Sequence, residues 1–285
     1  MATQGTRLGT IKRVRTVPGG AIQLRAVGVE DLASTAPTIA VTGSTLRRFP
    51  RNGVGRDFAV GDIHGCFTAL GQALKAIGFD ERVDRLFSVG DLVDRGPESD
   101  QVLAWLDRPW FHAICGNHDF LIWRAALGDP YTEVDYRMHG GMWLDHVPNV
   151  EKIHIGERLA TLPLAIEVET EQGIVGLVHA DCPFDDWRDM QSVDWSELDP
   201  TSSVGDCCLW SIERYARKYA GKVRNVRAVV HGHMMVSTAQ VLGNVHFIDS
   251  CGWRPGGHFT FLALDMLDAV QGPVNATTTL SRRNR

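Results

Sequence analysis

The sequence contains no apolar run that approaches the roughly 18 residues needed to cross a bilayer as a helix. Its N-terminus also lacks the apolar segment that marks a signal peptide. We therefore expect no membrane association and a cytoplasmic location. The 285 residues, 44% hydrophobic and 22% charged, are enough for a globular protein with a full hydrophobic core.

Cysteine pairs at metal-binding or redox spacing are absent as well. The chain has six cysteines, and no two of them form a Cys-x-x-Cys motif. Reduced thiols are expected rather than disulfides in a chain of this size. The net charge of −5 shows no overall basic excess, so nucleic acid is not expected as a main partner.

Acidic residues are scarce at the start of the chain. Residues 1–56 hold nine arginines and lysines but only Glu30 and Asp31 as acids. Such a composition is typical of a transit peptide, of an arm that binds polyanions, or of a solvated, partly disordered extension, and we favour the extension. We therefore divide the chain into a basic N-terminal extension (1–56), a main domain (57–270) and a C-terminal tail (271–285).

One pattern recurs from Asp57 onward. A short apolar stretch runs into glycine or histidine and then into residues with good metal-ligand atoms. Each stretch has the character of a fully buried strand, as expected for sheets covered on both faces. The five instances are FAVGDIHG (58–65), LFSVGDLVDRG (86–96), FHAICGNHD (111–119), IVGLVHAD (174–181) and AVVHGH (228–233).

Helix signals separate the first three of these strands. Apolar residues at helical spacing follow Gly65, and a second set follows the start signal Pro97-Glu98-Ser99. This predicts an α/β fold with a β-α-β-α-β core. Ligand sites in open α/β sheets lie beyond the carboxyl ends of the strands, so the five clusters are expected to meet in one crevice.

A single Asp-x-His or Asn-His is more often a turn or a satisfied polar pair than a metal site. Five clusters that converge are different, because burying several carboxylates and imidazoles together requires cations to compensate them. Asp, His and Asn ligands without thiolates suit Mn²⁺, Fe²⁺ or Zn²⁺ and argue against an iron–sulfur cluster. The number of ligands favours two metals bridged by a carboxylate and a water, an arrangement used for in-line attack on phosphorus.

The motifs GDIHG, GDLVDRG and GNHD, followed by HAD and GH, resemble the calcineurin-like metallophosphoesterase superfamily, and within it the phosphoprotein phosphatase family. The longer stretches GDIHGCFTAL, SVGDLVDRGPES, HGGMWL and HADCPFDDW are most similar to bacteriophage lambda-type Ser/Thr protein phosphatases. The resemblance covers roughly residues 57–265. It implies a four-layer αββα sandwich of two mixed β-sheets, a catalytic domain at 57–270, and two divalent ions, with Mn²⁺ favoured over Fe²⁺, Zn²⁺ and Mg²⁺.

The resemblance also assigns roles to individual residues. It makes Asp91 the carboxylate that bridges both metals and Asp119 a carboxylate that supports the start of the following helix. His118 paired with Asp94 is the general acid for the leaving alkoxide. The other assignments are Asp62 and His64 for the first metal, Asn117, His179 and His233 for the second, and Arg95 with Asn117 for the substrate phosphate.

Several positions depart from the family pattern. Lambda-type enzymes carry a second phosphate-binding arginine where this chain has Ile212, and Arg214 is the candidate replacement. His231 lies two residues before His233 and could point to the same face; we follow the family in choosing His233. The stretch DSCGWRPGG (249–257) is similar to the symmetrical dinucleoside tetraphosphatases of the same superfamily.

Three functions compete. The favoured one is a Ser/Thr protein phosphatase, with phosphotyrosine as a further candidate substrate and a phosphorylated protein or peptide as partner. The second is hydrolysis of dinucleoside polyphosphates. The tetraphosphatases have GDLVARG where this chain has GDLVDRG. The extra carboxylate, Asp94, favours the phosphatase, because a serine alkoxide needs an acid to leave. The third is a non-catalytic binding protein, against which the complete ligand set argues.

Overall fold

The computed structural model describes residues 46–129, 132–194 and 201–275, and within them two β-sheets. The five-stranded sheet has the order β11 (Asp268–Val274), β10 (His258–Ala263), β2 (Asp57–Val60), β3 (Arg85–Ser88) and β4 (Phe111–Ala113). The six-stranded sheet has the order β1 (Leu46–Phe49), β5 (Ala165–Thr170), β6 (Gly173–Val178), β7 (Ala228–His231), β9 (Val245–Phe247) and β8 (Gln240–Leu242).

The predicted β-α-β-α-β core is confirmed. Strands β2, β3 and β4 are parallel, with Phe58 opposite Leu86 and Leu86 opposite Phe111. Helix α1 (Phe67–Ala76) connects β2 to β3, and the 3₁₀ turn η1 (Ser99–Gln101) with α2 (Val102–Leu106) connects β3 to β4. The carboxyl ends of all three strands therefore lie at the same edge of the sheet.

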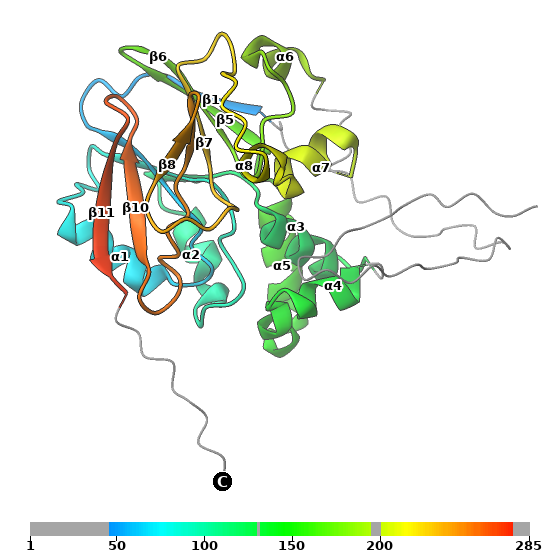
Figure 1. Cartoon of the computed structure of the whole chain (residues 1–285). Coiled ribbons are helices and arrows are strands. Elements are labelled where there is room, and N and C mark those ends of the chain that lie inside the picture. Colours follow the sequence, from blue (N-terminus) through cyan, green and yellow to red (C-terminus); the bar gives the residue numbers. More distant parts are fainter. Residues whose placement is uncertain (1–45, 130–131, 195–200, 276–285) are drawn as a thin grey trace, which may run out of the picture. The chain divides into compact units, whose positions relative to one another are not determined.

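The two sheets pack face to face with helices outside them. An apolar core between the sheets joins Ala59 and Phe87 of one to Ile166, Leu177 and Val230 of the other. Figure 1 shows α1 and α2 beside the five-stranded sheet, while α6 (Trp187–Ser192), α7 (Ser203–Trp210) and α8 (Glu213–Ala216) accompany the six-stranded one. This is the four-layer αββα arrangement of mixed sheets that the resemblance implied.

A further helical group carries the chain from β4 to β5. It consists of α3 (Asn117–Ala126), α4 (Glu133–Met138), the 3₁₀ helix η3 (Gly141–His146) and α5 (Asn149–Ala160) (Figure 1). Gly156 allows α3 and α5 to approach closely, since a Cβ there would lie 2.9 Å from the Cβ of Ala126. This group brings η3 against the loops that follow the parallel strands.

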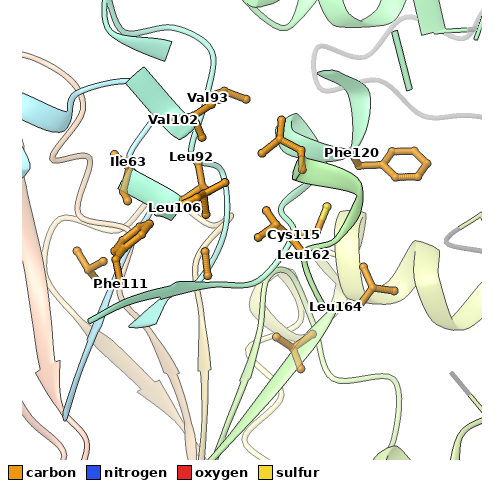
Figure 2. Packing of buried hydrophobic residues seen from close by; sticks show 14 of the residues in the cluster. Ile63, Leu92, Val93, Val102, Leu106, Phe111, Cys115, Phe120, Leu162 and Leu164 are labelled. Atoms are coloured by element: carbon orange, nitrogen blue, oxygen red, sulfur yellow. The ribbon is translucent and has the colours of Figure 1, made fainter. Parts of the chain in front are cut away.

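Apolar residues anchor the loops that carry the predicted ligands. Ile63 separates Asp62 from His64 in the sequence, and Leu92 and Val93 follow Asp91; all three apolar side chains are fully buried. Figure 2 shows them packed with residues of α2 and β4. The polar residues between them are thereby held in place by core packing.

The folded part extends beyond the boundaries predicted for the main domain. Strand β1 pairs in parallel with β5, although it lies in the segment assigned to the N-terminal extension. At the other end, β11 continues to Val274, past the boundary at 270. Both are edge strands, and the polar pattern LRRF of β1 gives no apolar run to recognise. Residues 1–45 and 276–285, which hold most of the predicted extension and tail, lie outside the described residues.

All six cysteines are free thiols, as predicted. Within the described ranges, no helix is both long enough and apolar enough to span a bilayer.

Packing outside the six-stranded sheet allows a stability test. The indole of Trp187 is fully buried and lies over Gly176, where an added Cβ would be 2.3 Å from the ring. We expect Gly176→Ala to lower the free energy of unfolding by about 1–3 kcal/mol, because the indole has no room to shift. Urea denaturation measures this. The matched control is Gly71→Ala in α1, where nothing lies within 4 Å of the added methyl, so stability should hold or rise. Equal effects of the two substitutions would contradict this account.

Candidate metal centre

The structure brings the six predicted metal ligands together at one edge of the two sheets. Asp62 and His64 follow β2, Asp91 follows β3, and Asn117 begins α3 after β4. His179 and His233 follow β6 and β7 of the other sheet. Five of these side chains are at most 3% exposed, so the cluster is shielded from bulk water: Asp62, His64, Asp91, Asn117 and His179.

Asp91 occupies the middle of the cluster. Its Oδ2 lies 3.5 Å from Nε2 of His64, and its Oδ1 lies 3.5 Å from Nε2 of His179. Asp91 belongs to two groups of three residues, and within each group the ligand atoms all lie within 4.8 Å of one another. The first group is His64, Asp91 and His118, and the second is Asp62, Asp91 and His179. One oxygen toward each imidazole is the geometry that a bridging carboxylate requires.

The second half of the cluster centres on Asn117. Its amide oxygen lies 2.9 Å from Nε2 of His179 and 3.1 Å from Nδ1 of His233. His231, the alternative to His233, instead places Nδ1 2.7 Å from the carbonyl oxygen of Val178. The structure therefore groups His233, and not His231, with the amide of Asn117.

The backbone is strained where these residues lie. His64, Asp91 and His233 have φ values of 46°, 51° and 57°, in the left-handed region that non-glycine residues rarely adopt. Each such residue costs on the order of 1–3 kcal/mol and persists only where its surroundings hold it. Here the amides of Ile63 and His64 both donate to the carbonyl oxygen of Asp91, which ties the first two loops together.

Backbone carbonyls fix the orientation of two imidazoles. Nδ1 of His64 lies 2.9 Å from the carbonyl oxygen of Val93, and Nδ1 of His179 lies 2.7 Å from that of Val89. Because a carbonyl oxygen can only accept, Nδ1 carries the hydrogen in both rings. The Nε2 lone pairs then face the cluster, as metal ligation requires.

The electrostatics of the cluster fit divalent cations. Burial lowers the pKa of His179 and of His233 to about 3, so both rings are neutral and have a free lone pair. Burial and the neighbouring charge of Asp249 raise the pKa of Asp62 well above its ordinary value. Asp249 itself is buried, and its Oδ2 has no hydrogen-bond partner within the described residues. Oxygen and nitrogen donors crowded in this way suit a hard or borderline divalent ion, which would compensate their charge.

Beside the cluster lies the predicted acid pair. Nδ1 of His118 is 2.7 Å from Oδ2 of Asp94, and the other oxygen of this carboxylate accepts a hydrogen bond of 2.8 Å from Nε1 of Trp143. Burial raises the pKa of Asp94 to about 8 and lowers that of His118 to about 4. Trp143 belongs to the HGGMWL stretch, but the sequence alone gave it no role.

Arg95 connects the acid pair to the cluster. Its NH1 lies 2.8 Å from Nε2 of His64 and its NH2 lies 2.9 Å from Nε2 of His118. The guanidinium carbon also lies 4.7 Å from the ring centroid of Trp253, a residue to which the sequence analysis assigned no function. An exposed guanidinium held between the two imidazoles is well placed to meet an anion.

The expected helix-supporting role of Asp119 is confirmed. Its Oδ1 accepts a 2.9 Å hydrogen bond from the amide of Leu92, and its Oδ2 accepts one of 2.9 Å from Gly116. The carboxylate thus joins the start of α3 to the loop after β3. It lies behind Asn117 and His118 and holds the segment that carries them.

The arrangement around Arg214 does not favour its predicted role in phosphate binding. The residue is buried, and its Nε lies 3.1 Å from Oδ1 of Asp181. Its NH1 donates to the carbonyl oxygen of Gly221 at 2.8 Å. Asp181 of the HAD motif therefore pairs with Arg214 of α8. Ile212, at the family's arginine position, is 50% exposed.

Comparisons with known proteins agree with this geometry. Residues 58–237 match the family model described as calcineurin-like phosphoesterase. The chain is 32% identical over 208 residues to serine/threonine-protein phosphatase 2 of Salmonella typhimurium, covering 70% of this chain and 88% of the relative. For serine/threonine-protein phosphatase 1 of the same organism the identity is 33%, covering 71% and 89%. A symmetrical bis(5'-nucleosyl)-tetraphosphatase of Nitrosococcus oceani is 33% identical over 147 residues, covering 46% and 53%.

Two solved structures share the fold. One is described as a putative diadenosine tetraphosphatase, with a TM-score of 0.57 and 22% identity, covering 82% of this chain and all of that one. The other is a protein serine/threonine phosphatase from Saccharomyces cerevisiae, with a TM-score of 0.59 and 14% identity, covering 85% and 87%. At these identities the likeness concerns the fold alone.

Proposed function

Because the chain belongs to the calcineurin-like phosphoesterase family, we propose that it is a metal-dependent phosphomonoesterase that acts on phosphoserine and phosphothreonine in proteins. The contact of 2.7 Å between His118 and Asp94 carries the proposal. A serine or threonine alkoxide is a poor leaving group, so its departure needs a proton from a positioned acid. The two Salmonella phosphatases support the same substrate class, since the alignments span nearly nine-tenths of their length.

The proposed cofactor is a pair of divalent ions, with Mn²⁺ favoured and Fe²⁺, Zn²⁺ or Mg²⁺ as alternatives. Asp62, His64 and Asp91 would hold one ion, and Asp91, Asn117, His179 and His233 the other. When bound, such ions polarise the phosphate and lower the pKa of a coordinated water, which makes a nucleophile available near neutral pH.

The protein's own residues account for the remaining steps. Arg95 binds two phosphate oxygens with its planar guanidinium, and the amide of Asn117 also faces the phosphate. To act as the acid, His118 must carry a proton on both ring nitrogens: Nδ1–H donates to Asp94, which holds the ring in the required orientation, and the Nε2 proton passes to the leaving oxygen. The negative charge of the bound phosphate favours this protonated ring over the neutral one, whose Nε2 lone pair otherwise accepts from Arg95. Trp143 holds Asp94 in turn. Phosphoproteins of the cytoplasm are the proposed substrates, and the free thiols agree with that compartment.

The second candidate is hydrolysis of a dinucleoside tetraphosphate. The tetraphosphatase relative and the Trp253 side chain beside Arg95 favour it. An aromatic ring at this position could stack on a nucleobase. Against it stands the acid pair, because a nucleotide phosphate leaves with less help than an alkoxide.

Turnover of two substrates, measured in separate assays, distinguishes the two functions. One preparation is stripped of metal, resupplied with Mn²⁺, and given a phosphothreonine peptide in one assay and diadenosine tetraphosphate in another. We expect the higher kcat/KM on the peptide and no turnover before metal is added. A higher value on the dinucleotide would contradict the proposal and place the protein in nucleotide metabolism.

A further inference from the structure

Two arginines share one indole beside the acid pair. The guanidinium carbon of Arg95 lies 4.7 Å from the ring centroid of Trp253, and that of Arg254 lies 5.9 Å from the same centroid. Both arginines are exposed. Stacking on an aromatic face restrains a guanidinium while its N–H groups stay available to a ligand.

Neither arginine has a carboxylate partner within the described residues. Most arginines of the structure do: Arg85, for example, lies 2.7 Å from Asp57, and Arg48 lies 2.9 Å from Glu167. Arg95 instead contacts the two imidazoles, and the backbone amide of Arg254 donates to the carbonyl oxygen of Cys251. Arg95 also lies near the buried carboxylates of Asp62, Asp94 and Asp249, without forming an ion pair with them. Burial raises the pKa values of these three groups, and the charge of Arg95 lowers them in part. Two exposed guanidinium groups on one ring, neither of them ion-paired within the described residues, form a site for an anion larger than one phosphate.

The other candidates for a second positive charge are not suitable. Position 212 holds isoleucine, and Arg214 is buried against Asp181. Arg254 is thus the exposed guanidinium that the structure places next to Arg95. Arg95 is held against His64 and His118, whereas Arg254 shares the Trp253 ring with it.

We propose that Arg254 binds an anionic group next to the phosphate held by Arg95, so that the enzyme prefers phosphopeptides with an acidic residue beside the phosphoserine or phosphothreonine. This inference rests on the proposed function. The carboxylate of that residue completes an ion pair with Arg254 in the complex. Since the pair is solvent-exposed, its contribution is modest, about fivefold in KM, and it weakens as salt screens it.

The test uses the Mn²⁺-loaded enzyme and two phosphothreonine peptides that differ only in Glu or Gln beside the phosphothreonine. KM and kcat are measured at low salt and at about 0.5 M salt, where the screening length is much shorter. The variants are Arg254→Gln, Arg254→Lys and, as matched control, Arg82→Gln, an exposed arginine that precedes β3 at the opposite end of the strand from the cluster. A small aryl phosphate reports on the chemistry alone.

We expect the wild-type enzyme to show a KM about fivefold lower for the Glu peptide, and this preference to shrink in high salt. Arg254→Gln should abolish the preference but leave kcat and aryl phosphate hydrolysis unchanged, while Arg254→Lys should keep part of it. Arg82→Gln should behave as wild type. A preference that survives in Arg254→Gln would overturn the inference, as would an equal loss on all three substrates. Failure of the proposed function itself would appear differently, as negligible turnover of both peptides by the wild-type enzyme.

Discussion

Asp91→Asn is expected to release metal from the protein. Each oxygen of this carboxylate lies 3.5 Å from a different imidazole, so one side chain serves both halves of the cluster. An amide keeps a single oxygen and places an NH₂ group where the second ion requires a donor atom. Loss of a residue that only supports a metal ligand costs about 10–100-fold in affinity, so loss of the shared ligand should cost at least about 100-fold.

The effect is measured by dialysing the purified variant and the wild type and determining the metal content of each by elemental analysis. Turnover should fall with the metal content. The matched control is Asp107→Asn, which removes a carboxylate whose side chain is 75% exposed, and it should retain both ions. Circular dichroism verifies that the Asp91→Asn variant is folded. Unchanged occupancy of both sites in a folded variant would remove Asp91 as the bridging residue.

His118→Asn is expected to slow turnover of a phosphoserine peptide by roughly 10²–10⁴, the usual contribution of general acid–base catalysis. The imidazole lies between Asp94 and the guanidinium of Arg95, and an asparagine cannot supply its proton. Asp94→Asn should cause a loss in the same range, because an uncharged amide no longer stabilises the protonated imidazole through Nδ1. The defect should shrink for an aryl phosphate, whose leaving group needs less protonation.

Dependence on the leaving group is the decisive feature of this prediction. The matched control is His154→Asn, an exposed histidine on α5, which should leave both rates unchanged. Metal content should also stay unchanged in His118→Asn if the residue acts as the acid. Equal losses on the peptide and the aryl phosphate would mean that His118 is not chiefly a proton donor. A loss of metal would instead make it a ligand, in line with its place 3.9 Å from Asp91.

Much of the fold could be predicted because the pattern repeats. Strands β2, β3 and β4 each combine a short apolar run with a polar end, and the rule for open α/β sheets then places their ends together. Short edge strands such as β1 and β8 could not be found in this way. Their sequences, LRRF and QVL, are too short to show a period. Strand β1 forms by pairing with β5, 119 residues further along the chain, and β8 by a tight hairpin with β9.

Some residues of the site could be predicted from the sequence and others could not. The motif residues Asp62 to His233 could be predicted because each follows a recognisable strand. Trp143, Trp253 and Asp249 could not, since their contacts with the site cross 49 residues or more of sequence and no local pattern encodes them. The surroundings of Arg214 could not be predicted either: its position after LWSIE suggested phosphate binding, and the structure pairs it with Asp181, 33 residues away.

Asp91 is proposed to bridge two divalent ions at the edge shared by the two sheets. A crystal grown with Mn²⁺ and measured for anomalous scattering locates these ions. Two anomalous peaks are expected, about 3.5–4 Å apart, with one oxygen of Asp91 toward each. A single peak, or two peaks that Asp91 does not join, would contradict the account.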